Sequence, residues 1–292
     1  MKEKFNIIVV IPVGPNTNID FLKDTIESIN YYLETIFKIV LCDDSQQGLG
    51  NHIQKFFPEI NVYTTVKSSG VFGGLYITLS EVYKYILLQY KFDFILKMDT
   101  DALMIGKNPQ IETQAFFNQN SKVGMAGLYS SGLKSTDFFG NEIDNSWVRN
   151  QLIKETCTWR LLRRPIANWT LRNVFLKAIR NGYEIGENVF GGAYFLTNAC
   201  LTKLNEAGFL PLNNLKKVIL EEDHIFSILT KIVGLNLGDL ASGNLPFACG
   251  WNVLPAPPEI LLEKGKKIIH STRNWRDLRE KEIRNYFKRY RV

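Results

Sequence analysis

The sequence has few cysteines and histidines and no long apolar run. Its four cysteines are far apart and form no CxxC pair, which excludes a zinc finger and a disulfide framework. We therefore expect reduced thiols. The apolar stretch from Ile7 to Ile11 is too short for a signal peptide, and no segment reaches the roughly 18 apolar residues of a membrane span. We expect a cytoplasmic protein in which this stretch is a buried strand.

Two common nucleotide-binding motifs are also missing. The glycine-rich segment 68–74 matches neither GxGxxG nor GxxxxGK[ST], which excludes the dinucleotide-binding and P-loop classes. Gly70 and Gly73 in this segment still allow close approach of the backbone to a nucleotide. The rest of the composition, 45% hydrophobic and 22% charged over 292 residues, is that of an ordinary globular protein.

The net charge of +6 is concentrated in two segments. Residues 151–180 carry seven Lys and Arg against one acid, and residues 273–292 carry eight against three. A regional excess of this kind indicates an anionic partner. Aromatic and aliphatic side chains at near-helical spacing predict a basic amphipathic helix over 273–292. This helix either lies on the anionic inner face of the cell membrane or packs on the domain.

Strands alternate with helices over the first hundred residues. Apolar runs predict strands at 5–13, 36–42, 61–66 and 94–98, and helical spacing predicts helices at 19–35, 49–57 and 75–90. This alternation predicts an α/β fold with a mostly parallel sheet and helices on both faces.

The second half is less regular. We expect strands at 121–130, 193–197 and 266–269, helices within 149–181 and at 213–234, and a loop at 240–260. No linker-like or repeated segment divides the chain. The prediction is one domain over 1–272, with a nucleotide-binding half (1–105) and an acceptor half (106–272).

Acidic residues follow two of the predicted strands. Asp99 and Asp101 end the strand at 94–98, and such a pair can hold a divalent cation that bridges a diphosphate. His270, after the last strand, would complete the site and favour manganese over magnesium. The alternatives are an ordinary Asp turn and a surface histidine. Asp43 and Asp44 either contact a nucleotide or, for Asp43, cap the next helix.

Three consecutive acids, Glu221, Glu222 and Asp223, lie next to apolar residues. Glu222 and Asp223 are the candidates for a base that takes the proton of an acceptor hydroxyl. The alternative is the acidic first turn of a helix, which the helix dipole favours. Gly191 and Gly192 either allow a sugar or phosphate to approach or form a tight turn.

In this order the motifs resemble those of the inverting GT-A glycosyltransferases of the family 2 type. The resemblance rests on Ile7 to Pro12, Asp43-Asp44-Ser45, Asp99-Thr100-Asp101, Phe190 to Tyr194, Glu222-Asp223 and His270-Ser271. It implies a Rossmann-like GT-A domain that transfers a sugar from a nucleoside diphosphate sugar to a hydroxyl, with inversion. The acceptor would be a glycan or a lipid-linked saccharide, as in cell-envelope polysaccharide synthesis.

The resemblance also implies roles for individual residues. Asp44 would contact the base, Asp99 and Asp101 would bind the diphosphate through Mn²⁺ or Mg²⁺ with His270, and Asp223 would face the acceptor. The donor site implied is Pro12, Asp43, Asp44, Gly70, Gly73, Asp99, Gly191 and Gly192. One alternative is a sugar nucleotidyltransferase, for which a glycine- and arginine-rich loop is expected after the first strand; Pro12-Val13-Gly14-Pro15 contains no arginine. The other alternative is a non-catalytic module that binds nucleotides or polyanions. Nucleic acid is not an expected partner, because the acids repel phosphates unless a metal intervenes.

Overall fold

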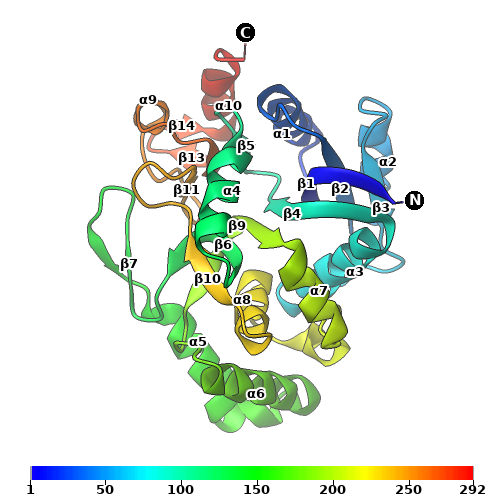
Figure 1. Cartoon of the computed structure of the whole chain (residues 1–292), viewed down its shortest axis with the longest axis vertical. Coiled ribbons are helices and arrows are strands. Elements are labelled where there is room, and N and C mark those ends of the chain that lie inside the picture. Colours follow the sequence, from blue (N-terminus) through cyan, green and yellow to red (C-terminus); the bar gives the residue numbers. More distant parts are fainter. Residues whose placement is uncertain (1, 292) are drawn as a thin grey trace.

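A seven-stranded sheet forms the centre of the protein, whose computed structural model describes residues 2–291 (Figure 1). In spatial order its strands are β10 (Asn236–Asp239), β6 (Val123–Ser130), β9 (Asn188–Thr197), β4 (Tyr90–Met98), β1 (Glu3–Val13), β2 (Phe37–Asp43) and β3 (Asn61–Thr64). Only β9 runs antiparallel to its neighbours in this sheet. The predicted α/β fold with a mostly parallel sheet is confirmed.

Helices cover both faces of the sheet. One face carries α3 (Gly73–Gln89), α5 (Ser146–Cys157), α6 (Pro165–Arg180), α7 (Asn198–Glu206) and α8 (Glu222–Ile232), and the other carries α1 (Ile19–Tyr32), α2 (Leu49–Gln54) and α4 (Pro109–Gln119). Alternate residues of β1 enter opposite cores: Ile8 and Val10 enter the first, and Ile7, Val9 and Ile11 the second. A continuous apolar strand is what burial on both faces requires.

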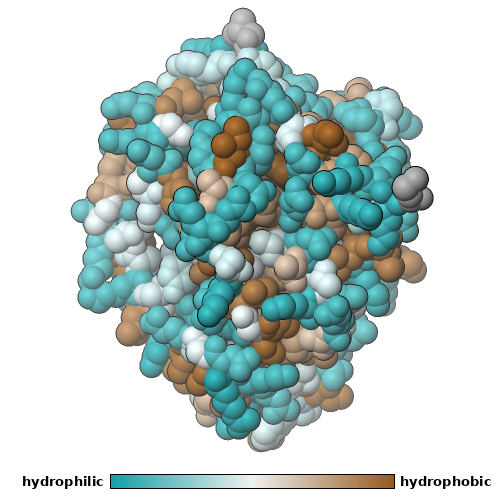
Figure 2. Space-filling view, viewed as in Figure 1, coloured by the Kyte–Doolittle hydropathy of each residue, from teal (hydrophilic) through white to brown (hydrophobic). Residues whose placement is uncertain are grey.

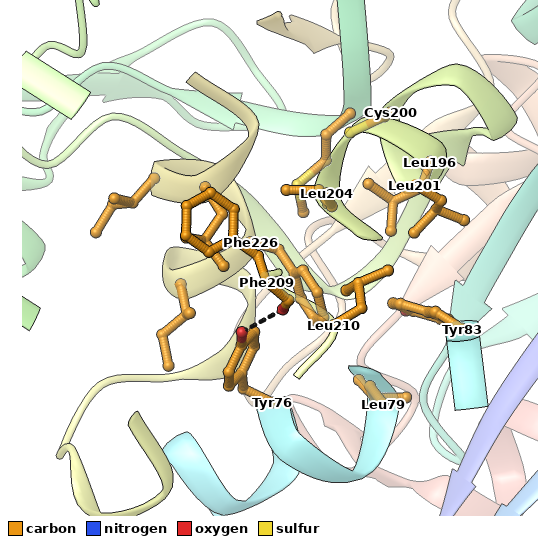
Figure 3. Packing of buried hydrophobic residues seen from close by; sticks show 14 of the residues in the cluster. Tyr76, Leu79, Tyr83, Leu196, Cys200, Leu201, Leu204, Phe209, Leu210 and Phe226 are labelled. Carbon is orange, nitrogen blue, oxygen red and sulfur yellow. Dashed lines mark hydrogen bonds between the residues drawn. The ribbon is translucent and has the colours of Figure 1, made fainter. Parts of the chain in front are cut away.

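The first core fixes the position of α8. Figure 3 shows Phe226 of α8 packed near Tyr76 and Tyr83 of α3, with Leu201 and Leu204 of α7 close by. The Tyr76 hydroxyl donates a hydrogen bond of 2.5 Å to the Phe209 carbonyl, so its buried oxygen is satisfied. This packing holds the first turn of α8, with its acids, against the sheet.

A small sheet lies beside the large one and carries the C-terminal part of the chain. Its strands are β11 (Phe247–Cys249), β12 (Ile268–His270) and β5 (Leu103–Met104), and it packs with α9 (Pro258–Glu263) and α10 (Glu280–Lys288). Short hairpins pair β7 (Lys134–Thr136) with β8 (Glu142–Asp144) and β13 (Asn274–Trp275) with β14 (Leu278–Arg279). Because β12 pairs with β5, His270 is brought to the end of β4.

Several element boundaries differ from those expected. The helix expected at 213–234 is two elements, the 3₁₀ helix η2 (Asn213–Lys217) and α8, and the acids lie at the start of α8. The segment 149–181 divides into α5, the 3₁₀ helix η1 (Trp159–Leu162) and α6, because Pro165 begins a new helix. Helices α4 and α7 were not expected from the sequence. No helix among residues 2–291 is both long and apolar enough to cross a bilayer.

The C-terminal segment packs on the domain. Its helix covers only 280–288, because residues 274–279 form a hairpin. Ile283 and Phe287 of α10 are buried in a third hydrophobic core, which lies around the small sheet. Arg284 is also buried and pairs with Asp24 of α1 at 3.0 Å. Of the two roles considered for 273–292, packing is confirmed for this apolar face, and membrane contact through the rest of the segment stays a prediction.

Candidate active site

Asp99, Asp101 and His270 come together at the carboxyl end of β4. One ligand atom from each lies within 4.8 Å of the other two. Asp101 and His270 are buried, and the Asp99 side chain is partly exposed. The backbone N–H of Asp99 donates to the carbonyl of Gly192 at 3.0 Å, which ties this turn to β9. The structure thus brings together the three residues expected to hold a metal.

The His270 ring is oriented for a ligand role. Its Nδ1 lies 2.9 Å from the Gly250 carbonyl oxygen, so Nδ1–H donates there and Nε2 is the atom that faces the acids. Nε2 lies 3.3 Å from Asp101 and 3.8 Å from Asp99. A Cβ on Gly192 would overlap the imidazole, so this position requires glycine. Two carboxylates with one oriented imidazole fit a divalent transition metal such as Mn²⁺.

Asp101 is held in its charged form. Burial raises the pKa of its carboxyl, but His270, the Ser271 hydroxyl and Arg273 outweigh burial and keep the pKa below its usual value. Ser271 Oγ donates to Oδ2 at 2.7 Å, and Arg273 Nε lies 2.7 Å from the same oxygen. A carboxylate that stays ionised is what a cation ligand needs.

Lys97 connects the turn Asp99-Thr100-Asp101, the DxD turn, to the acids of α8. Its side chain is almost fully buried in β4, and its Nζ lies 2.6 Å from Asp99 and 3.1 Å from Glu222. Nζ also donates to the Gly191 carbonyl. Burial lowers the pKa of Lys97, but the two carboxylates outweigh burial and hold the pKa above its usual value. The lysine is therefore a permanent cation that fixes Asp99 and Glu222.

Asp223 lies beside the glycines of β9. A Cβ on Gly191 would be 3.1 Å from the Asp223 carboxylate, so glycine allows this close approach. One carboxylate oxygen accepts the His224 backbone N–H at 2.8 Å. Burial is the largest influence on the pKa of Asp223 and raises it above its usual value, although Lys97 acts against burial. A raised pKa suits a carboxylate that accepts a proton near neutral pH.

The acids after β2 are satisfied by the protein itself. Asp43 is fully buried and accepts the backbone N–H groups of Ser45 at 3.0 Å and Gly50 at 2.8 Å. It therefore stabilises the turn into α2, as the capping alternative expected. Asp44 accepts the hydroxyls of Thr65 at 2.6 Å and Ser68 at 2.8 Å. Asp44 thus shapes the glycine-rich loop, and contact with a nucleotide base stays a prediction.

The remaining donor-site candidates are spread over this end of the sheet. Pro12 lies near the end of β1, where it pairs with Cys42 of β2. Gly70 is exposed in the loop before α3 with a φ of 80°, a conformation that favours glycine. Gly73 is buried at the start of α3, where a Cβ would overlap the Leu215 carbonyl. Because Gly73 has no side chain, the start of α3 can pack closely against η2.

A cavity of about 720 Å³ adjoins the site. It lies between β6, the β7–β8 hairpin and the loops around β11. Its aromatic lining consists of Tyr129, Phe138, Phe139, Trp147, Phe190, Phe247 and Trp251. The Phe190 ring is centred 5.8 Å from the His270 ring. Trp147 and Trp251 stack with ring centres 6.5 Å apart and planes 25° apart. Aromatic walls of this kind accept flat apolar faces and exclude water.

Lys97 and the pair Trp147 and Trp251 were not expected in the site from the sequence. A lysine inside the apolar run Phe-Ile-Leu-Lys-Met is a signal, because a buried cation needs anionic partners. Trp147 and Trp251 are about a hundred residues apart in the sequence, and no local pattern indicates that they meet.

The comparisons with solved structures agree with this fold. The chain is similar to the bifunctional glycosyltransferase WbbM, with a TM-score of 0.53 and 11% identity over 97% of this chain and 49% of that chain. A weaker likeness is to the mannosyltransferase PcManGT from Pyrobaculum calidifontis in complex with GDP-Man and Mn²⁺ (TM-score 0.46, 9% identity, 82% of this chain and 56% of that chain). Another is to a glycosyltransferase involved in the glycosylation of the major capsid of PBCV-1 (TM-score 0.43, 10% identity, 97% of this chain and 99% of that chain).

The chain spans about half the length of the first two of these structures. No protein-family model and no curated protein matches the sequence. The strand order, the single antiparallel strand and the likeness to WbbM define the fold as that of the GT-A glycosyltransferases. The expected fold class is confirmed.

Proposed function

We propose that this protein transfers a sugar from a nucleoside diphosphate sugar to a hydroxyl group of a saccharide acceptor. One observation carries the proposal: two neighbouring glycines of β9 bring the Asp99, Asp101 and His270 cluster close to the carboxylate of Asp223. Gly192 lies against His270 of the Asp99, Asp101 and His270 cluster, and Gly191 lies against Asp223. A donor diphosphate on the first group and an acceptor hydroxyl on the second would meet at this strand.

The donor side suits a diphosphate. Asp99, Asp101 and His270 would hold Mn²⁺ or Mg²⁺, which would neutralise the charge of the departing diphosphate. Arg273, whose side chain is more than half exposed beside Asp101, offers a second positive group at the same edge. The loop at Gly70, ordered by Asp44, would approach the nucleoside.

The acceptor side suits a single displacement with inversion. The acceptor oxygen would attack the anomeric carbon as the carbon–oxygen bond to the diphosphate breaks, and the electron pair would leave with the nucleoside diphosphate. The hydroxyl proton would pass to Asp223. Glu222 forms an ion pair with Lys97 at 3.1 Å. We therefore assign Glu222 a positioning role, in which it helps to hold Asp99 and its neighbour in α8, Asp223.

The aromatic cavity would hold the acceptor. Its walls touch both sides of the site, since Phe190 contacts His270, and Trp147 lies 5.3 Å from the ring of His224, next to Asp223. Stacked indoles present flat faces that fit the apolar faces of sugar rings. A glycan or a lipid-linked saccharide is therefore the acceptor class that we propose.

Binding of nucleoside diphosphates tests the donor site. We expect one of UDP, GDP, CDP, ADP and TDP to raise the melting temperature only with Mn²⁺ or Mg²⁺. At a hundredfold excess over Kd the stabilisation amounts to about 2.7 kcal/mol. Asp101→Asn should abolish this effect, and Asp93→Asn, an exposed acid on the same strand, should keep it. No stabilisation by any diphosphate with either metal contradicts the proposal.

Asp223→Asn separates catalysis from binding. This variant should bind the same diphosphate as the wild type and lose sugar transfer by about 100- to 10,000-fold, because only the base is removed. The anomeric configuration of the product, read by NMR, tests inversion.

The nucleotidyltransferase and the non-catalytic binding module gain no support from any observation on this chain.

A further inference from the structure

Four large apolar side chains are exposed at the corner between α5 and α6. Trp159 and Leu162 of η1 are 65% and 75% exposed, and Ile166 and Trp169 of α6 are 70% and 48% exposed. We call these four residues the α5–α6 corner. Figure 2 shows apolar, brown surface between hydrophilic side chains over the lower part of the molecule, where Figure 1 places α5 and α6. Exposed apolar residues that gather in one place on a protein surface often mark an interaction site.

The four side chains are arranged on two short faces. Trp159 and Leu162 are three residues apart in a 3₁₀ helix, which places them on one side of it. Ile166 and Trp169 are three residues apart in the first turns of α6 and share a face there. The inward side of α6 is already filled by Ala167 and by further residues that belong to the core. The corner is therefore additional apolar surface that the fold itself does not need.

Positive charge surrounds the corner. The Arg163 guanidinium lies 4.7 Å from the centre of the Trp159 ring, and that of Arg172 lies 5.9 Å from the centre of the Trp169 ring. The only acid within 151–180, Glu155, is buried and paired with Arg160 at 2.8 Å. The neighbouring η2 adds two exposed lysines, Lys216 and Lys217.

We propose that the α5–α6 corner docks on an anionic membrane surface. Tryptophan and aliphatic side chains would enter the boundary between headgroups and acyl chains, and the arginines beside them would pair with anionic headgroups. Indole suits this position because its ring is apolar and its N–H is a hydrogen-bond donor. The charged residues of η1, α6 and η2 are all basic, which favours an anionic surface over a second copy of this basic chain.

The corner is joined to the active site by one helix. Trp147, in the wall of the cavity, lies in the first turn of α5, and the corner begins just beyond the end of this twelve-residue helix. Twelve helical residues span about 18 Å. If the chain acts on a saccharide as proposed above, docking here would hold the cavity near the membrane and select an acceptor carried on a lipid. The docking itself does not depend on that activity.

Co-sedimentation of the full chain with lipid vesicles tests the docking. One set of vesicles is phosphatidylcholine with roughly a third phosphatidylglycerol, and the other is phosphatidylcholine alone. We expect binding to the anionic vesicles that weakens with added salt. The double variant Leu162→Glu with Ile166→Glu should lower the partition coefficient by about tenfold or more.

The matched control is Ile36→Glu with Ile111→Glu, two isoleucines that are each 63% exposed outside the corner. It adds the same charge, so it should keep most of the binding. Equal loss in both double variants, equal binding by wild type and corner variant, or no wild-type binding to anionic vesicles would overturn the proposal. So would light scattering that shows a dimer which only the corner variant dissociates. Metal-dependent binding of a diphosphate should be the same in both variants, which separates this test from that of the proposed function.

Discussion

At the scale of single residues, two adjacent glycines separate the two halves of the proposed chemistry. Gly192→Ala would push a methyl group into the His270 ring, and Gly191→Ala would place one 3.1 Å from the Asp223 carboxylate. We expect Gly192→Ala to lose metal-dependent stabilisation by the diphosphate. Gly191→Ala should keep that stabilisation and slow transfer by about tenfold, because a shift of the base misaligns it.

Thermal shift and initial-rate measurements on both variants check this crossed pattern. Each variant serves as the control for the other, since both add one methyl group to the same strand. Loss of diphosphate binding in both, or in neither, would mean that β9 does not divide the site in this way.

Single residues also show what the sequence could and could not indicate about the site. The meeting of Asp99, Asp101 and His270 was predictable, because Asp99 and Asp101 end a strand and the carboxyl ends of parallel strands share one edge. The role of Asp43 was not, because a buried turn and a nucleotide contact place the same residue type after a strand. Lys97 was overlooked although a charge in an apolar strand is itself a signal.

At the scale of elements, the start of α8 concentrates negative charge in the interior. Glu221 precedes the helix, and Glu222 and Asp223 lie in its first turn. Burial, followed by the charges of the other acids, raises the pKa of Glu221 from 4.5 to about 7. Burial also raises the pKa of Glu222 and of Asp223 above their usual values. The folded state therefore binds these protons more tightly than the unfolded state does.

The pH dependence of stability follows from this difference. Protonated Glu221 contributes to the free energy of unfolding. This contribution is complete below pH 4.5 and is lost as the pH rises through about 7. Glu221→Gln carries no titrating group, so at pH 8.5 it should be more stable than the wild type by about 1 kcal/mol, after allowance for partial exposure. Urea unfolding at pH 5 and 8.5 measures this, with the exposed Glu206→Gln as control. A variant that is less stable than the wild type at pH 8.5 would contradict it.

Elements also differ in how well the sequence predicts them. The alternation of strands and helices up to β4 was predictable, because buried parallel strands are continuous apolar runs. The direction of β9 was not, because an apolar strand pattern carries no information on which way the strand runs. The single helix expected at 213–234 is interrupted from Val218 to Leu220. Apolar residues continue through this segment, so the sequence pattern does not show that the backbone leaves the helix.

At the scale of the whole molecule, the last helix supports the turn that carries Asp99 and Asp101. Arg284 of α10 donates to the Thr100 carbonyl at 2.7 Å, between Asp99 and Asp101. The same guanidinium pairs with Asp24 of α1 at 3.0 Å and with Glu280 at 2.9 Å. A single buried side chain thus joins the C-terminus, the first helix and the DxD turn. The tail is part of the proposed active site's support.

Replacing this arginine should therefore affect both stability and function. Arg284→Met would leave Asp24 with less compensation, and the expected loss of unfolding free energy is about 3–5 kcal/mol. Metal-dependent stabilisation by the diphosphate should also weaken, because the Thr100 carbonyl would lose its donor and the turn would relax. Arg289→Met, an exposed arginine directly after the same helix, is the matched control and should change neither quantity. If Arg284→Met bound the diphosphate as the wild type does at a temperature where both are folded, the tail would contribute to stability alone.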